Sequence, residues 1–367
     1  MLGAMMHSQG RLYAFDVSPA RLARMRPRLK RSGLSNLQPY LIQNEHDTKV
    51  KRLAGKIDLV HVWPLGALAT LEEARRLGIP TVLERPNAHT RFAFEVVDAE
   101  CKRLGVSLPP DHEHAFNETI LAREEREYEL ADALLCPSDF VVQTFLDRGT
   151  SPEKLVRHIY GYDETEFFPA ARTADPEEGL TMLYVGVAAV RKGLHFALEA
   201  WLRSPASQTG TFLIAGDVLP AYGKRLEPAL GHPSVRVLGH RTDVAQLMRS
   251  SDVLVLPSIE EGFGLVCTEA MGSGCVPLVS DACTDICRHD ENALVHEVAD
   301  VDALERHITA LDQDRASLTR LRSGCLETAP AVTWKAAGVV LRDAYRDVLL
   351  RFGRPAPERS PALLSPP

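Results

Sequence analysis

The sequence lacks a long apolar run: none of its 367 residues belongs to a stretch near the roughly 20 apolar residues that a membrane-spanning helix needs. It also lacks a basic amino-terminal region followed by an extended apolar stretch, so no secretory signal peptide is expected. Apolar residues make up 45%, charged residues 25% and aromatic residues 6%, which excludes a largely disordered, collagen-like or coiled-coil chain. We therefore expect a globular, cytoplasmic protein of two or three domains, with peripheral contact to a membrane left open.

Closely spaced cysteines are lacking, and the spacing of those present predicts no metal site. The seven cysteines are scattered, and the closest pair, Cys283 and Cys287, does not have a common zinc-binding spacing. An odd and scattered set indicates reduced, mostly buried thiols in a cytosolic protein. His112 and His114 in the segment DHEH are interpreted as part of a solvated loop in preference to metal ligands.

The net charge of the whole chain is small, but two of its parts carry net charges of opposite sign. The net charge is −7, so nucleic acid is not expected as a partner. Residues 1–60 hold 11 Lys and Arg against 4 Asp and Glu, or +7, and the remaining residues hold 31 against 45, or −14. A shift this abrupt indicates two segments of different origin or with different partners.

Short β-rich apolar runs alternate with longer helical patterns, which is typical of parallel α/β sheets. Strands are predicted at residues 11–17, 38–42, 58–63, 80–83 and 133–136, and in a second series at 182–185, 211–215, 235–238, 252–256, 276–279 and 293–295. Helices are predicted at 72–77, 118–129, 140–148, 194–203, 244–249, 265–272, 303–311 and 336–352. The two series meet in a segment rich in turn residues around 165–180. The predicted fold class is therefore α/β, with two Rossmann-like domains whose parallel sheets face a central cleft.

A glycine-containing loop with two cations follows the predicted strand at 182–185. Gly186 permits a tight turn, and Arg191 and Lys192 stand just before the next predicted helix. Backbone N–H groups and the helix dipole also favour an anion there, so the loop suits a diphosphate. Taken alone, however, the pattern is more often an ordinary strand–helix turn with solvated cations.

The strongest feature is a loop with two acids, PSIEEGFGLVCTEAMGSG, at residues 257–274. It follows a predicted strand, and its glycines, Gly262 and Gly264, allow close backbone approach. Glu261 lies in the loop and Glu269 in the helix that follows, so both can face the carboxyl edge of the sheet, where open α/β sheets bind ligands. Carboxylates accept hydrogen bonds from vicinal hydroxyls, which favours a sugar and a ribose as ligands. The competing interpretation, a helix cap and a surface glutamate, does not explain why these residues occur together.

In their order along the chain, these motifs resemble those of family 4 glycosyltransferases of the retaining GT-B type. The resemblance covers residues 61–350 and rests on the pattern Glu261-x7-Glu269, the loop YVGVAAVRKG and the segments VRVLGHRTDVAQLMRSSDVLVLPS, RHIYGYDETEFFP and ELADALLCPSDFVVQTF. It implies transfer of a sugar, with retention of configuration, from a UDP- or GDP-linked donor. The acceptor (a saccharide, a lipid-linked molecule or a small molecule) is not identified. No metal and no cofactor are expected, because cations and amides neutralise the leaving diphosphate in this family.

The resemblance also implies roles for individual residues. Arg191 and Lys192, beside Gly186, would bind the diphosphate. Glu269 would hold the ribose hydroxyls, and Glu261 would position the transferred sugar. The supporting backbone groups would come from Gly239, His240, Phe263, Gly264 and Leu265.

The chain departs from the family pattern at Val187, where an arginine is common, and Arg191 is expected to compensate. In the first domain, His89 is either a contact to the donor sugar or acceptor, and thus catalytic, or a loop histidine bonded to nearby backbone. Arg85 and Arg91 are candidates for binding a charged acceptor group.

Residues 9–60 instead resemble a fragment of an RNA cytosine-C5 methyltransferase, in which Asp16 would hold the ribose of S-adenosylmethionine. The glycine-rich loop expected before Asp16 and the catalytic cysteine expected after Asp58 are missing from the sequence, so a fusion is predicted near residues 57–62. Arg21, Arg24, Arg28 and Arg31 recur at helical spacing, which favours a solvated cationic face over a site for RNA or lipid.

These observations divide the chain into four parts. Residues 1–60 form a methyltransferase-like βαβ fragment joined to the N-terminal sheet, and 61–170 complete an N-terminal acceptor domain that is truncated and re-headed. Residues 178–352 form the nucleotide-sugar domain, and 353–367 a disordered, proline-rich tail. The leading hypothesis is a glycosyltransferase. The alternatives are a donor-binding protein with impaired catalysis and, remotely, an RNA methyltransferase.

Overall fold

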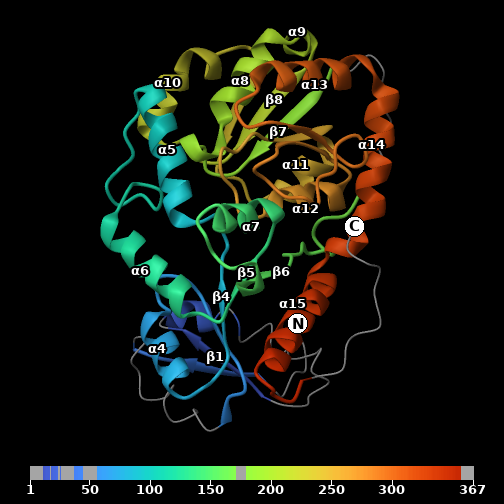
Figure 1. The fold of residues 1–367 in the computed structure, drawn as a ribbon. Helices are drawn as coiled ribbons and strands as arrows, with labels where there is room; N and C mark the ends of the chain where they lie inside the picture. Colours follow the sequence, from blue (N-terminus) through green and yellow to red (C-terminus); the bar gives the residue numbers. More distant parts are fainter. Residues whose placement is uncertain are drawn as a thin grey trace.

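The computed structural model describes residues 11–16, 18–23, 25, 37–43, 56–170 and 179–356. Within these residues, the named strands form sheets of two, four and six strands in which every pairing is parallel. The four-stranded sheet lies in the lower part of Figure 1 and the six-stranded sheet in the upper part, each with helices packed around it. The described part of the chain contains no helix that is long and apolar enough to cross a bilayer.

The four-stranded sheet belongs to the N-terminal domain and has the order β3-β4-β5-β6. These strands are Val60–Val62, Thr81–Glu84, Ala133–Cys136 and Leu155–Arg157. β4 and β5 are buried along their whole length, as expected for central strands of a parallel sheet. The helices are α4 (Leu68–Arg76), α5 (Thr90–Leu104), α6 (Glu118–Leu130), α7 (Asp139–Leu146) and the short 3-10 helix η2 (Pro152–Lys154).

The six-stranded sheet belongs to the C-terminal domain and has the order β12-β11-β10-β7-β8-β9. Its strands are β7 (Thr181–Val185), β8 (Thr211–Ala215), β9 (Val235–Gly239), β10 (Val253–Leu256), β11 (Val276–Ser280) and β12 (Leu294–His296). The surrounding helices are η3 (Val190–Lys192), α8 (Leu194–Arg203), α9 (Ala206–Thr209), α10 (Pro220–Leu230), α11 (Val244–Ser250), α12 (Leu265–Ser273), α13 (Val301–Gln313), α14 (Arg315–Thr328) and η4 (Ala329–Val332). Because β7 and β10 are parallel neighbours, the loops that follow them leave the same edge of the sheet side by side.

Each predicted strand overlaps an observed one. Among the described residues, the elements that were not predicted are β6, α5, α9, α10, α14 and the three 3-10 helices. β6 has only three residues, too few to show an alternating pattern. α10 contains Gly223 and Pro228, which read as breakers in sequence. α5 carried a usable signal, because its buried residues Ala93, Phe94, Val97 and Cys101 recur at helical spacing.

Two helices cross between the domains. The last helix, α15 (Trp334–Arg351), places Ala344 and Val348 against Val82 and Leu135 of the four-stranded sheet. In Figure 1, α15 accordingly runs beside the lower domain, although it follows the upper domain in sequence. In the opposite direction, Val97 of α5 joins the hydrophobic core around the six-stranded sheet. The predicted C-terminal domain, 178–352, therefore ends in a helix that packs on the N-terminal sheet.

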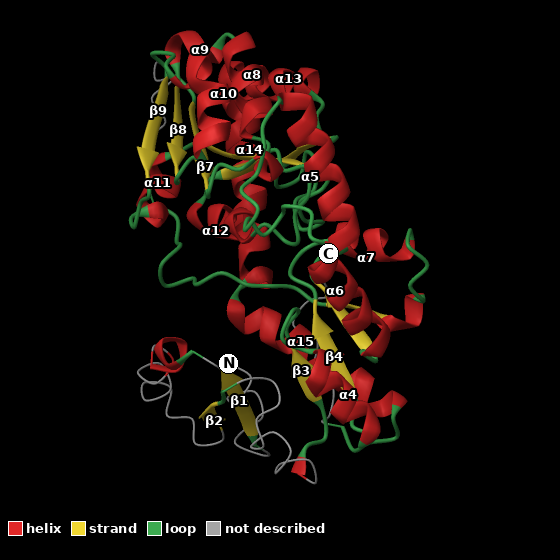
Figure 2. Cartoon of the chain, turned by 90° about the vertical axis from the view of Figure 1, so that its left-hand side faces the viewer, coloured by secondary structure: helices red, strands yellow, loops and turns green. Residues whose placement is uncertain are grey.

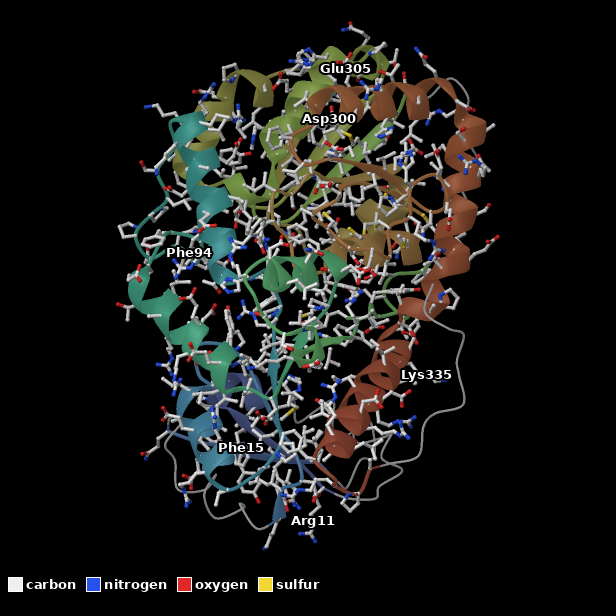
Figure 3. The ribbon with its side chains drawn as sticks, viewed as in Figure 1. Arg11, Phe15, Phe94, Asp300, Glu305 and Lys335 are labelled. Atoms are coloured by element: carbon white, nitrogen blue, oxygen red, sulfur yellow. The ribbon has the colours of Figure 1, made fainter. Side chains whose placement is uncertain are left out.

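The amino-terminal fragment forms a separate parallel pair of strands, β1 (Leu12–Asp16) and β2 (Leu37–Leu41). Ser18 caps the helical residues 19–23, its Oγ accepting a hydrogen bond from the Arg21 amide at 3.3 Å. The predicted joining of this fragment to the N-terminal sheet is wrong for the described residues, because β1 and β2 pair only with each other. The separation is visible in Figure 2, and Figure 3 places Arg11 and Phe15 at the end of the molecule opposite Asp300 and Glu305.

Several predictions fall on residues that the structure does not describe. These are the arginines of the cationic face beyond Arg21, the linker at 171–178 and the tail from residue 357.

Candidate functional site

The two loops singled out in the sequence are hydrogen-bonded to each other at the carboxyl edge of the six-stranded sheet. The amide of Ile259 donates to the carbonyl of Arg191 at 2.9 Å. Gly193, with φ of 65°, lies so close that a Cβ atom there would stand 1.9 Å from the carbonyl oxygen of Pro257. Only glycine fits this contact. The contact brings the cations of η3 beside the loop that holds Glu260 and Glu261, which we call the glutamate loop.

Glu261 lies between the two cations. Its Oε2 pairs with Lys192 Nζ, and its Oε1 is 3.4 Å from Arg191 Nη1. The side chain is 8% exposed, and burial alone would raise the pKa of this carboxyl. Lys192 and Arg191 outweigh burial and hold the pKa of Glu261 at about 2, so the carboxylate stays ionised at neutral pH.

The glutamate loop is also seated on the N-terminal domain. A Cβ atom on Gly262 would lie 1.5 Å from the carbonyl oxygen of Pro86, which follows β4. Ser138, at the start of α7, donates its hydroxyl to the carbonyl of Gly262 at 2.7 Å. Glu260, fully buried, accepts the Ala88 amide at 3.0 Å. The site therefore lies where the carboxyl edges of both sheets meet.

The amides expected to face an anion begin α12. Gly264 is its N-cap residue with φ of 67°, and Leu265 is 39% exposed. Phe263 is buried, and its ring meets that of Tyr160 edge-on at 5.5 Å. Since the first amides of a helix have no partner within the helix, the Leu265 end of α12 offers donors to a ligand.

Glu269 lies inside α12, half-buried, and its environment differs from that of Glu261. Burial and the nearby Glu166 raise the pKa of Glu269 to about 7. The carboxyl therefore changes charge near neutral pH, whereas Glu261 does not.

The remaining residues predicted to face the donor lie at adjacent strand ends. Gly186, with φ of 134°, donates its amide to Ala215 at 3.0 Å, and Gly216 donates to the carbonyl of Gly239 at 2.8 Å. These bonds bring the ends of β7, β8 and β9 together, and His240 is exposed beside them.

His89 lies in the N-terminal domain as the N-cap residue of α5. Its Nδ1 accepts the Arg91 amide at 3.2 Å, and its ring packs against Tyr128 and Phe145. Burial, together with Arg148 and Arg85, lowers the pKa of His89 to about 3, so the ring is neutral. This local bonding corresponds to the structural alternative weighed in the sequence.

The two arginines suggested for the acceptor are both in ion pairs. Arg85 is buried and lies 3.4 Å from Glu124, with its guanidinium 4.5 Å from the centre of the Tyr128 ring. Arg91 donates two hydrogen bonds of 2.8 Å to Glu125. Arg91 therefore joins α5 to α6, and Arg85, which directly follows β4, joins the β4–α5 segment to α6.

The expectation of a solvated loop at His112 and His114 is wrong for His114. This ring is 5% exposed, and its Nε2 lies 3.5 Å from Oε2 of Glu260. Among the described residues, no group of three or more histidines, cysteines, aspartates or glutamates could hold a metal ion. All seven cysteines are buried, and none of them forms a disulfide.

A buried cluster around the carboxylate of Glu84, at the carboxyl edge of the N-terminal sheet, was not predicted from the sequence. Glu84, which ends β4, lies 3.1 Å from His61 and 2.8 Å from His158 and accepts the Tyr160 hydroxyl at 2.5 Å. Burial would raise the pKa of Glu84, but the two histidines lower it to about 2. The signal was the position of these residues at or just after the carboxyl ends of β3, β4 and β6, which belong to one parallel sheet. Tyr345 of α15 contacts His61 at 2.6 Å, so the cluster also anchors that helix.

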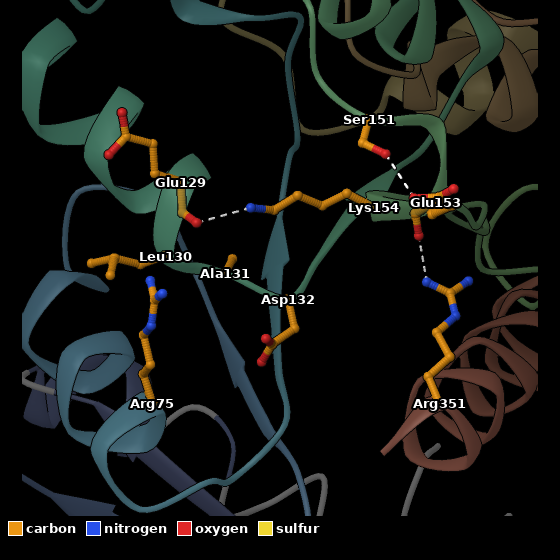
Figure 4. Close-up of a pocket in the computed structure, with 9 residues that line it drawn as sticks. All are labelled: Arg75, Glu129, Leu130, Ala131, Asp132, Ser151, Glu153, Lys154 and Arg351. Atoms are coloured by element: carbon orange, nitrogen blue, oxygen red, sulfur yellow. Dashed lines mark hydrogen bonds between the residues drawn. The ribbon is translucent and has the colours of Figure 1, made fainter. Parts of the chain in front are cut away.

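A cavity of about 430 Å³ lies at the opposite, amino-terminal edge of the same sheet (Figure 4). Lys154 donates to the Glu129 carbonyl at 3.0 Å, and Arg351 donates to the Glu153 carbonyl at 2.5 Å. None of the predicted site residues lines this cavity. Its residues are Arg75, Glu129, Leu130, Ala131, Asp132, Ser151, Glu153, Lys154 and Arg351.

Comparison with known proteins agrees with this geometry. Residues 179–314 match the family described as glycosyl transferases group 1. The D-inositol 3-phosphate glycosyltransferase of Stackebrandtia nassauensis is 27% identical over 338 residues, which cover 84% of this chain and 72% of that protein.

Two solved structures have the same fold. HepE of Anabaena, crystallised with UDP, has a TM-score of 0.67 at 15% identity, covering 92% of this chain and all of that one. Sucrose-phosphate synthase of Thermosynechococcus elongatus has a TM-score of 0.65 at 21% identity, covering 84% and 77%. The predicted GT-B arrangement is thereby confirmed, and the matches support an enzyme of the glycosyltransferase class, with residues 179–314 similar to the group 1 family.

Proposed function

We propose that the chain transfers a sugar, with retention of configuration, from a UDP- or GDP-linked donor to an acceptor held by the N-terminal domain. The observation that carries the proposal is the meeting of Arg191, Lys192 and Glu261 where the two sheets face each other. Two cations and an ionised carboxylate at the N-terminus of α12 suit a ligand with a diphosphate and neighbouring hydroxyls.

Each part of the donor has a proposed partner. The diphosphate lies against Lys192 and Arg191, with the α12 amides as further donors, and Glu269 accepts from the ribose. Glu261 accepts hydrogen bonds from the transferred sugar. The sugar–diphosphate C1–O bond breaks, a C1–O bond to the acceptor hydroxyl forms on the same face, and the hydroxyl proton passes to the released diphosphate. Side-chain cations and amides neutralise the leaving group without a metal ion, so transfer should persist in EDTA.

The test is transfer from UDP- and GDP-sugars, followed by proton NMR of the anomeric centre. The acceptor panel includes inositol 3-phosphate, because the curated relative is named for it. The proposal predicts a product with the donor's anomeric configuration. Inversion of configuration would overturn the retaining mechanism.

A second function, donor binding without efficient transfer, is favoured by one observation. In the part of the chain that the structure describes, β1 and β2 form a sheet of their own and do not extend the acceptor domain's sheet beyond β3. Donor binding with neither hydrolysis nor transfer across the panel would favour this function. The predicted methyltransferase origin of the fragment is tested separately by titration with S-adenosylmethionine, for which we expect no binding.

A further inference from the structure

Glu260 precedes the proposed sugar-binding Glu261 and is the most deeply placed charge of the site. The residue is fully buried, and its carboxylate has partners from three segments. Oε1 accepts the Ala88 amide at 3.0 Å, and Oε2 lies 3.4 Å from Arg191 Nη1 and 3.5 Å from His114 Nε2. Two of these partners belong to the N-terminal domain and one to the phosphate-facing loop.

A buried carboxylate of this kind is stable only while its partners are in place. Removing an ion from water is unfavourable, and hydrogen bonds and opposite charges must offset that cost. Because Ala88 and His114 lie across the domain boundary, Glu260 has its full set of partners only when the N-terminal domain is docked on the glutamate loop. Arg191 is held twice, since it also donates to the Glu260 carbonyl at 2.9 Å.

Glu260 and its partner Ala88 are each next in sequence to a residue of the candidate site. Along one chain segment Glu260 adjoins Glu261, and along the other its partner Ala88 adjoins His89, the N-cap residue of α5. The contacts of Gly262 with Pro86 and Ser138 fix the same two segments against each other.

We infer that Glu260 is a positioning residue, which makes the placement of the diphosphate-binding Arg191 depend on docking of the N-terminal domain through Ala88 and His114. The inference rests on the proposed function, since Arg191 is taken to bind the donor. A donor-site cation is thereby set in place by the domain that binds the acceptor.

The experiment compares Glu260→Ala, Glu260→Gln and His114→Ala with the wild type, with exposed Glu297→Ala as the matched control. Two quantities are measured: the dissociation constant for UDP-glucose or whichever donor the wild type binds, and hydrogen exchange of the peptide that contains the Ala88 amide. Glu260→Ala should raise the dissociation constant about tenfold or more and expose the Ala88 amide. Glu260→Gln can still accept that amide through its carbonyl oxygen but presents no charge to Arg191. It should therefore weaken donor binding while leaving Ala88 exchange close to wild type.

His114→Ala should raise the dissociation constant in the wild-type background and have less than about a twofold further effect when Glu260 is already glutamine. If Glu260→Ala does not fold, the glutamine variant decides the question. Wild-type donor affinity in Glu260→Gln, with a folded protein, would overturn the inference. Failure of the wild type to bind any donor would instead overturn the proposed function, and the Ala88 exchange would still report the domain contact.

Discussion

At the scale of single residues, the site is defined by the contact of Glu261 with Lys192 and Arg191. The sequence predicted each of these residues as a ligand contact, from its own local motif. It did not predict that they touch, because 69 residues separate Lys192 from Glu261 and the contact depends on β7 and β10 being neighbours. The same limit applies to His114 and Glu84, whose partners come from distant segments.

Variants of the buried pair Lys192 and Glu261 should separate the effect on stability from the effect on activity. Lys192→Ala and Glu261→Ala should each abolish transfer. Lys192→Ala should also lower the free energy of unfolding by about 3 kcal/mol, because it leaves a buried carboxylate with less compensation. The double variant should recover part of that stability but none of the activity. Chemical denaturation and transfer assays measure the two quantities, and equal stability of the single and double variants would contradict this account.

Glu269 should make donor affinity depend on pH. With its pKa raised to about 7, the carboxyl is protonated below neutral pH and becomes a stronger acceptor for ribose hydroxyls as the pH rises through 7. Affinity for UDP-glucose should increase about fivefold from pH 6 to pH 8 and become flat in Glu269→Gln. UDP-glucose is the better probe, because the terminal phosphate of UDP would itself titrate near pH 6, as other phosphomonoesters do at about that value. A wild-type profile that does not change across this range would rule out the proposed role of Glu269.

At the scale of elements, the sequence predicted best where local signals are strong. β5, β8 and α8 have the predicted bounds, because each is a clear apolar or amphipathic run that ends at residues which break the pattern. The sequence predicted the helix α15 but could not assign it to a domain. A helical pattern shows that one face is buried but not which sheet covers that face. Its partners, Val82 and Leu135, are more than 200 residues away.

Packing of α15 on the N-terminal sheet should be measurable by truncation. Val348 is 1% exposed, whereas Leu350 on the same helix is 49% exposed. Val348→Ala should lower the free energy of unfolding by about 1–2 kcal/mol, since it leaves a cavity against the sheet. Leu350→Ala, which removes more atoms, should change it by less than about 0.5 kcal/mol. Similar losses in both variants would contradict the observed packing.

At the scale of the whole molecule, each of the two domains packs one helix against the core of the other domain. α5 contributes Val97 to the core of the C-terminal domain, and α15 contributes Val348 to that of the N-terminal domain. The sequence predicted two domains and a cleft but not this exchange. The charge asymmetry that marked residues 1–60 corresponds to a separate sheet in the described residues, and the fusion near 57–62 stays a prediction.

Because of this exchange, the domains should unfold together. Scanning calorimetry should show one thermal transition, and a saturating donor should shift it as a whole. Two transitions, of which only one responds to the donor, would show that the exchanged helices do not couple the domains.

The central claim is that the loops after β7 and β10 together bind a nucleotide-sugar. A calorimetric titration of the folded wild type and of Lys192→Ala with UDP- and GDP-sugars tests it most directly. The wild type should bind at least one of these donors, and Lys192→Ala should bind it about a hundredfold more weakly, equivalent to a charge-assisted contact of about 3 kcal/mol. A folded wild type that binds none of them, or a lysine variant with unchanged affinity, would contradict it.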